Sequence, residues 1–202
     1  RSVWLGYGEG DNAFIAAPQP GWISSMHVER GALVHRGDLL FTLDDTAQVA
    51  NRDQAVATLT SAKASLEQEQ ANLAYARIQL TRQTGLDRAH AGTPANLDLA
   101  RSNYQQSQAR IAQLQSQIAQ MSASLSGATY SLTQRNVMAQ TEGRVQDIYF
   151  RTGEYVPAST PILSILPPKN IYVRFFVPET QFSQVHIGQK VRITCDGCRP
   201  MT

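Results

Sequence analysis

The sequence lacks three features that would place it in common functional classes. No stretch approaches the roughly 18 consecutive apolar residues of a membrane-spanning helix, and residues 1–12 lack the apolar core of a signal peptide. Charged residues make up only 17% of the 202 positions, and the net charge of +2 is too balanced for a typical nucleic-acid-binding module. The chain is therefore predicted to bind no nucleic acid, and any targeting segment is expected to be absent from it.

Cysteine and histidine are too few and too scattered to predict a metal site. Cys195 and Cys198 form one C-x-x-C pair with no second ligand pair near it. This pair is predicted to be either a small disulfide in an oxidising compartment or two free thiols in a reducing one. The four histidines are His27, His35, His90 and His186. Because no Ser/His/Asp arrangement or phosphate-binding glycine loop is present either, neither an enzyme activity nor a cofactor is expected.

Glycine and proline divide the chain into three parts. They are frequent before residue 46 and again after about residue 137, where they alternate with apolar and β-branched residues. Between these parts, the runs 46–84 and 95–126 contain neither residue. With 42% hydrophobic residues the chain can pack a core. The predicted order is therefore strands, a long helix, a second long helix, and strands.

Apolar or small residues recur at the first and fourth positions of a seven-residue repeat in both runs. In the second run these are Leu97, Ala100, Tyr104, Ser107, Ile111, Leu114, Ile118, Met121, Leu125, Ala128 and Leu132. In the first run they are Leu59, Ala62, Leu66, Leu73, Ala76 and Leu80, with Glu69 as a polar exception. Such a sustained heptad pattern predicts that two helices of nearly equal length pack as an antiparallel coiled-coil hairpin.

The ends of the predicted helices carry recognisable signals. A ten-residue loop is expected between the two breaker-free runs. At its end, Thr93 is expected to be the N-cap and Pro94 the first residue of the second helix. Gly127 is expected to weaken or bend that helix near its end. Away from the heptad seam, the helix faces are rich in Gln, Ser and Ala. These faces are either solvated or pack against copies of the same chain.

The two β-rich parts are related by an internal repeat at a spacing of 122 residues. The matched pairs are Ala17 and Ala139, Gly21 and Gly143, Ile23 and Val145, Met26 and Ile148, Gly31 and Gly153, Val34 and Val156, Leu40 and Ile162, Phe41 and Leu163, and Leu43 and Ile165. The matched glycines are predicted to be structural turn residues, with a positive φ expected at Gly31 and Gly153. The matched apolar positions are predicted to face one shared core.

The repeated segments carry a family resemblance. APQPGWISSMHVERGALVHRGDLLFTLDD resembles the first half of a biotinyl/lipoyl-type β-sandwich, and MAQTEGRVQDIYFRTGEYVPASTPILSIL resembles the second half. In lipoyl and biotinyl carriers, a tight turn between the halves presents the lysine that bears the cofactor. Here the helical insertion replaces that turn, and the nearest lysine, Lys63, lies within a predicted helix. This arrangement disfavours a carrier function.

A lipoyl-like domain split by a helical hairpin resembles the periplasmic adaptor proteins, or membrane fusion proteins, of the HlyD type. The tail NIYVRFFVPETQFSQVHIGQKVRITCDG is similar to the first segment of the family's β-barrel, and its matching residues are Val177, Pro178, Glu179, Gly188, Gln189 and Val191. The resemblance implies an α+β fold with a lipoyl-like domain over 13–45 and 137–168 and a hairpin over 46–136. The start of a barrel is expected over 169–202, truncated at the C-terminus.

This resemblance implies a transport function without catalysis. Such adaptors are periplasmic, are anchored at the inner membrane of Gram-negative bacteria, and join an inner-membrane transporter to a TolC-type outer-membrane channel. Here an ABC-type transporter is favoured and the anchor is expected to be absent from the chain. The lipoyl-like domains are expected to form a ring, usually of six copies. The hairpin tip would contact the channel through Arg82, Arg88 and Thr93, although the family's Arg-Leu pair is missing from RQTGLDRAHAGTP.

Two alternatives belong to other functional classes. The first is a true lipoyl or biotinyl carrier, which would require an exposed acceptor lysine between the two halves. The second is a structural coiled-coil spacer without a transport role. The arginines near the tip are either part of a channel contact or solvated loop charges. If the periplasmic assignment holds, Cys195 and Cys198 are expected to be oxidised.

Overall fold

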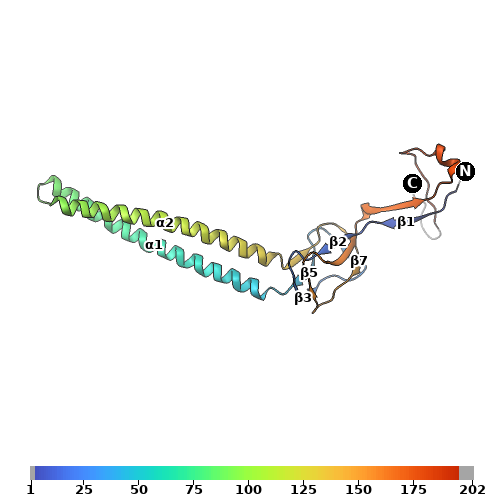
Figure 1. The fold of residues 1–202 in the computed structure, drawn as a ribbon, viewed down its shortest axis with the longest axis horizontal. Coiled ribbons are helices and arrows are strands. Elements are labelled where there is room, and N and C mark those ends of the chain that lie inside the picture. The colour runs from blue at the N-terminus through green and yellow to red at the C-terminus, as the bar shows by residue number, and fades with distance from the viewer. Residues whose placement is uncertain (1–2, 196–202) are drawn as a thin grey trace.

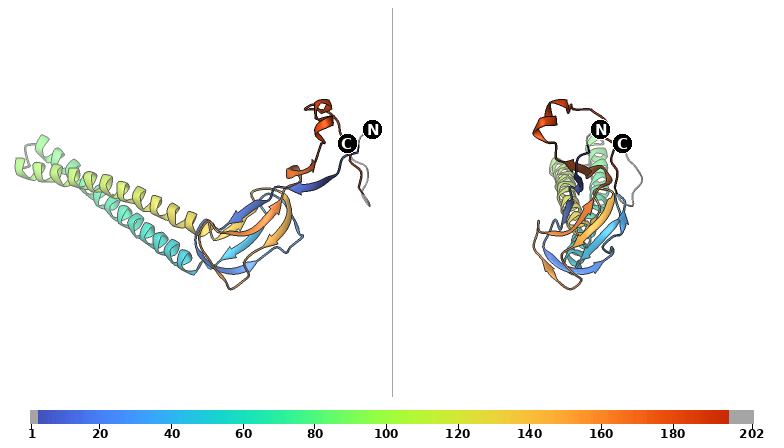
Figure 2. Two further views of the ribbon diagram at one scale, coloured as in Figure 1. Left: turned by 45° about the vertical axis from the view of Figure 1, so that its right-hand side comes forward. Right: turned by 90° about the vertical axis from the view of Figure 1, so that its right-hand side faces the viewer.

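The computed structural model describes residues 3–195 and shows an elongated molecule (Figure 1). A helical hairpin extends from one end of a β-sandwich, and a small two-stranded sheet lies at the opposite end, as Figure 2 also shows. The hairpin is inserted between the two halves of the sandwich, as the α+β prediction requires. No helix in the described part of the chain has the length and apolar character needed to cross a membrane.

Each sheet of the sandwich combines strands from both sides of the hairpin. The strands before it are β2 (Ala13–Ala16), β3 (Gly21–Met26), β4 (Leu33–Val34) and β5 (Leu39–Leu43). The strands after it are β6 (Asn136–Met138), β7 (Gly143–Ile148), β8 (Tyr155–Val156) and β9 (Pro161–Leu166). One sheet has the order β2-β9-β7-β4 and the other β6-β5-β3-β8. The two halves therefore interlock, and neither can complete a sheet alone.

The sequence repeat is a repeat of hydrogen bonds as well as of residues. The Gly31 N–H donates to the Val145 carbonyl, and the Gly153 N–H donates to the Ile23 carbonyl, both at 2.8 Å. The matched apolar residues fill one core between the sheets. Its fully buried members include Ile23, Val34, Leu40, Phe41, Leu43, Val145, Val156, Ile162, Leu163 and Ile165. Alternating apolar positions thus define the inner faces, as the pattern predicts.

The four repeated glycines have two different structural roles. Gly31 and Gly153 have φ values of +87° and +90°, a conformation that glycine adopts without strain. Gly21 and Gly143 differ from the prediction of turn residues, because they are the first residues of β3 and β7. At Gly143 a Cβ atom would collide with the carbonyl oxygen of Leu166. Gly143 is therefore needed for close approach of the Leu166 backbone, whereas Gly21 leaves space for the end of the Arg135 side chain.

The hairpin helices are longer than the sequence predicts. α1 runs from Thr46 to Arg88 (43 residues) and α2 from Pro94 to Thr133 (40 residues). α1 continues through Gly85 and α2 through Gly127, so the expected ten-residue loop is reduced to the segment 89–93. Packing between the helices outweighs the weak helix propensity of a single glycine. The predicted heptad positions are the buried or half-buried ones along both helices.

The small sheet joins the two ends of the described chain. β1 (Gly6–Gly10) pairs antiparallel with β10 (Ile171–Phe175), and Trp4 stacks on Phe175 with ring centroids 5.6 Å apart. Short 3-10 helices flank β10 at Pro168–Asn170 and Glu179–Gln184. After Gln189, the described residues contain only an isolated bridge at Ile193, and the expected start of a barrel forms no closed barrel there. Cys198 lies outside the described residues, so its pairing with Cys195 stays a prediction.

Candidate functional site

The hairpin tip is closed by a helix-capping motif at the end of α1. The Ala91 N–H donates to the Leu86 carbonyl at 2.9 Å, and the His90 N–H donates to the Asp87 carbonyl at 3.0 Å. These two bonds are those of a Schellman motif, in which the residue after the cap takes a left-handed conformation. His90 has that conformation, with φ of 53°. The motif satisfies carbonyl groups at the end of α1 and fixes the direction of the turn.

Thr93 and Pro94 begin α2 as the sequence predicts. The Thr93 side-chain oxygen accepts a hydrogen bond from the Asn96 N–H at 3.3 Å, and Pro94 occupies the first turn. Gly92 lies against α1, where a Cβ atom would come within 3.2 Å of the Leu86 Cβ. The tip is therefore a short, capped turn with a defined shape. Its Thr93 hydroxyl has a capping role, which leaves the methyl group of that side chain for other contacts.

The two arginines predicted at the tip lie on α1 and are exposed to solvent. Because they are six residues apart, Arg82 and Arg88 project in directions about 120° apart around the helix. The structure therefore does not bring them onto one face. Neither forms an ion pair with any described residue. Arg88 lies in the last turn of α1, where a positive charge also interacts favourably with the helix dipole.

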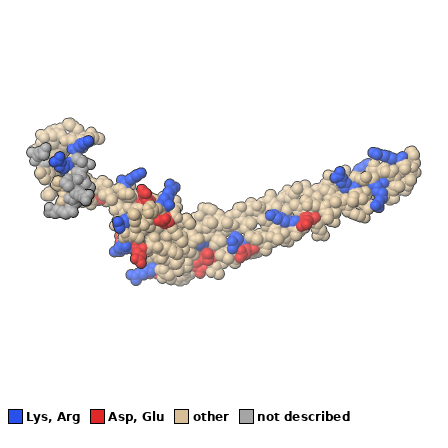
Figure 3. Space-filling view, turned by 180° about the vertical axis from the view of Figure 1, so that it is seen from behind, with Lys and Arg blue, Asp and Glu red and all other residues tan. Residues whose placement is uncertain are grey.

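Basic residues gather at the free end of the hairpin, which Figure 3 shows from one side. The arginines of this region are Arg77, Arg82, Arg88 and Arg101. Only two carboxylates accompany them, Asp87 and Asp98, and Asp98 lies 3.6 Å from Arg101. The tip therefore carries an excess of positive charge, available to an acidic partner surface.

Exposed apolar side chains accompany these arginines, and the sequence analysis missed them. Tyr75, Ile78 and Leu99 are 65%, 58% and 61% exposed. Leu86 lies four residues after Arg82, on the same side of α1. Their positions outside the heptad seam are the signal that could have identified them. Exposed aromatic and aliphatic side chains beside arginine are typical of protein–protein interfaces.

One acidic residue is enclosed in the seam between the helices. Glu69 is only 7% exposed and accepts a hydrogen bond from the Asn72 amide at 3.1 Å. That bond, then one from Ser107, and to a smaller extent the charge of Arg110, hold the pKa of the Glu69 carboxyl below its usual value, although burial opposes the change. The polar exception in the heptad pattern is thus a carboxylate with partners on both helices.

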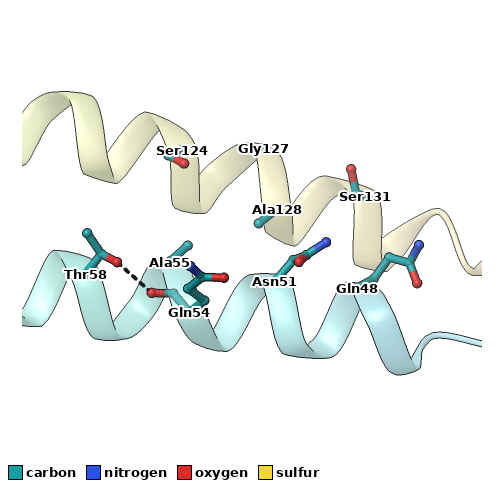
Figure 4. A pocket seen from close by; sticks show the side chains of 9 residues that line it. All are labelled: Gln48, Asn51, Gln54, Ala55, Thr58, Ser124, Gly127, Ala128 and Ser131. Atoms are coloured by element: carbon teal, nitrogen blue, oxygen red, sulfur yellow. Dashed lines mark hydrogen bonds between the residues drawn. The ribbon is translucent and has the colours of Figure 1, made fainter.

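Where the helices approach the sandwich, the gap between them is a polar groove rather than an apolar pocket (Figure 4). Its lining residues are Gln48, Asn51, Gln54, Ala55, Thr58, Ser124, Gly127, Ala128 and Ser131. The Thr58 hydroxyl donates to the Gln54 carbonyl at 2.9 Å. The described residues contain no cluster of three or more His, Cys, Asp or Glu side chains that could hold a metal ion. The arrangement suits contact with a partner better than chemistry on a bound small molecule.

Comparisons with known proteins identify the architecture. The multidrug resistance protein MdtA of Proteus mirabilis is 31% identical over 172 residues, which are 84% of this chain and 38% of that protein. The crystal structure of MacA from Actinobacillus actinomycetemcomitans superimposes with a TM-score of 0.82 at 22% identity, covering 98% of this chain and 63% of that one. This is the fold of the periplasmic adaptor proteins. No family model matches the chain.

A second solved structure supports the same architecture. The membrane fusion protein Spr0693 from Streptococcus pneumoniae R6 matches with a TM-score of 0.61 at 17% identity, covering 93% of this chain and 74% of that chain. The predicted resemblance to adaptor, or membrane fusion, proteins is therefore confirmed. The chain spans well under half the length of MdtA and about two thirds of the solved MacA chain. It comprises the hairpin, the sandwich and the small terminal sheet of the adaptor fold.

Proposed function

We propose that this chain is part of a periplasmic adaptor that links an inner-membrane transporter to a TolC-type outer-membrane channel. The observation that supports this most directly is the hairpin itself. At about 1.5 Å per residue, the 43 residues of α1 extend roughly 65 Å from the sandwich. The far end of the hairpin is a capped turn with exposed arginine and apolar side chains. A long, narrow hairpin whose far end exposes side chains typical of protein–protein interfaces can connect two membrane complexes.

The role that we propose is structural and non-enzymatic. Arg82, Arg88 and Thr93 belong to the surface that would meet the channel, with Leu86 and Leu99 beside them. The sandwich, over 13–45 and 137–168, would pack with copies of itself in a ring of six. The segment 169–202 would contribute to the region that contacts the transporter, for which an ABC-type partner is favoured.

A photo-crosslinking amino acid at position 88 tests the channel contact in cells. We expect the Arg88 variant to form a covalent adduct with an outer-membrane channel, identified by mass spectrometry of the membrane fraction. The same amino acid at Thr152, exposed on the sandwich and far from the tip, is the matched control and should give no channel adduct. If position 88 gives no adduct while expression is normal, or if Thr152 gives the same one, the proposed contact is wrong.

The lipoyl or biotinyl carrier remains a less favoured function. The position at which a carrier presents its lysine is occupied by the base of the hairpin, and Lys63 lies on the exposed side of α1. An intact mass without a lipoyl or biotinyl adduct is therefore expected for protein purified from cells that make both cofactors. A structural spacer without a transport role would be supported instead by normal export after deletion of the gene.

A further inference from the structure

The hairpin and the sandwich have separate cores and meet only at a narrow junction. The cluster of buried residues in the sandwich includes no residue of α1 or α2, and no described helix packs extensively along a strand. The chain crosses the junction twice, at Asp44–Thr46 and at Gln134–Asn136. Two crossings without shared packing would leave the hairpin free to swing. Its orientation must therefore be set by contacts at the crossings themselves.

Arg135 connects three separate segments at this junction. Its N–H donates to the Leu132 carbonyl at 3.1 Å, and its own carbonyl accepts from the Leu43 N–H at 2.8 Å. Its guanidinium Nη1 donates to the Pro20 carbonyl at 2.7 Å, across 115 positions of the sequence. One residue thus joins the last turn of α2, the end of β5 and the segment that leads into β3.

The surroundings of Arg135 are shaped around its side chain. A Cβ atom at Gly21 would lie 2.6 Å from the Arg135 Nη1, so glycine at that position makes room for the guanidinium. Arg135 Nε is buried and has no hydrogen-bond partner among the described residues. Burying an unpaired N–H costs free energy, which a freely solvated arginine would avoid. The side chain is therefore held in the junction by its contacts.

The internal repeat indicates that the sandwich does not itself need this arginine. The position equivalent to Arg135 in the other half is Ala13, at the start of β2. The half without a hairpin beside that position therefore completes its sheet with a small side chain. Asp44, on the other crossing, is also tied locally: the N–H and then the hydroxyl of Thr46 hold the pKa of its carboxyl below the usual value, with a smaller effect from the charge of Arg135.

We infer that Arg135, seated against Gly21 and bonded to the Pro20 carbonyl, is a lock that fixes the orientation of the hairpin relative to the sandwich. With the lock closed, a rotation of the sandwich is transmitted to the tip as rigid-body motion. With the lock open, the hairpin swings about its two crossings. This inference concerns the mechanics of the chain and holds independently of the partners proposed above.

Distance measurements between spin labels test the lock directly. One label would be placed on α2 at Gln115 and the other on the sandwich at Thr152, both exposed, in a protein whose two native cysteines are replaced by serine. We expect Arg135→Met to widen the distance distribution about twofold, because hinge motion at the crossings is no longer restrained. Gly21→Ala should widen the distribution similarly. Arg135 is then still present, but the methyl group of the new alanine displaces its guanidinium from the Pro20 carbonyl.

Arg144→Met is the matched control. The Arg144 guanidinium also donates to a backbone carbonyl, that of Gly31, but within the sandwich and away from the hairpin. Its loss should leave the distribution unchanged. The inference is wrong if the Arg135→Met and Gly21→Ala proteins keep the width of the parental distance distribution. It is also wrong if Arg144→Met widens that distribution as much as they do. Unchanged far-UV circular dichroism in each variant ensures that the helices are intact, and Gly21→Ala alone decides the question should Arg135→Met fail to fold.

Discussion

At the scale of single residues, the internal repeat allows the backbone conformation of a residue in one half to be compared with that of the equivalent residue in the other half. Gly37 and Ser159 occupy equivalent positions, and both have a positive φ, of +94° and +63°. The N–H groups also make equivalent bonds, from Gly37 to the Ala139 carbonyl and from Ser159 to the Ala17 carbonyl. Gly37 adopts this conformation without steric cost, whereas Ser159 adopts it with strain.

Replacing Ser159 by glycine should therefore stabilise the sandwich. Removing the strain of a left-handed Ser is expected to raise the free energy of unfolding by up to about 1 kcal/mol, partly offset by the greater freedom of glycine in the unfolded chain. Urea denaturation measures the change. The reciprocal variant Gly37→Ser is the control and should lose about 1 kcal/mol. A Ser159→Gly protein less stable than the parent would show that the serine side chain makes a contact worth more than the strain.

At the scale of elements, polar contacts of Glu69 in the seam help to align the two helices of the hairpin. Glu69 faces Ser107 and Arg110 of α2 from α1, and Asn72 bonds it from its own helix. Because these partners lower the pKa of Glu69 in the folded state below the value of 4.5 expected when unfolded, the ionised form stabilises the hairpin. That contribution is complete above the unfolded pKa and is lost as the pH falls through the folded pKa.

Acidification should thus weaken the hairpin through Glu69. Between about pH 6 and about pH 3, we expect the melting temperature of the parent, followed by far-UV circular dichroism, to fall more than that of Glu69→Gln. Glu67→Gln removes an exposed carboxylate from the same helix and should follow the parent. Equal pH dependence in the parent and Glu69→Gln would exclude this role for the enclosed carboxylate.

At the scale of the whole molecule, the sandwich and hairpin are separately packed bodies. The sandwich core is built entirely from the two repeated halves, and each half supplies two strands to each sheet. The hairpin has its own seam, in which Ala62, Ala76 and Ala100 are buried where the helices approach closely. The hairpin is therefore an insertion that the sandwich tolerates rather than requires.

Deleting the hairpin should leave a folded sandwich. With residues 46–133 replaced by a short glycine-rich linker, we expect a well-dispersed amide NMR spectrum and cooperative thermal unfolding, because no core side chain is lost. A linker inserted instead at Gly153, within a turn that holds the two halves together, provides the contrast and should impair folding. Collapsed amide dispersion in the deletion protein would mean that the hairpin takes part in folding the sandwich.

The sequence by itself determined the periodic parts of this protein. Its heptads fixed which faces of α1 and α2 meet, and its repeat of 122 residues paired Ile23 with Val145 and Val34 with Val156 in one core, because spacing along a chain dictates which side chains share a face. Only the tertiary structure decided which strands pair across the hairpin, that β1 joins β10, and that Arg135 reaches the Pro20 carbonyl. Those contacts join residues at least 94 positions apart in the sequence. They depend on loop directions and on the space left by glycine, which no local pattern encodes.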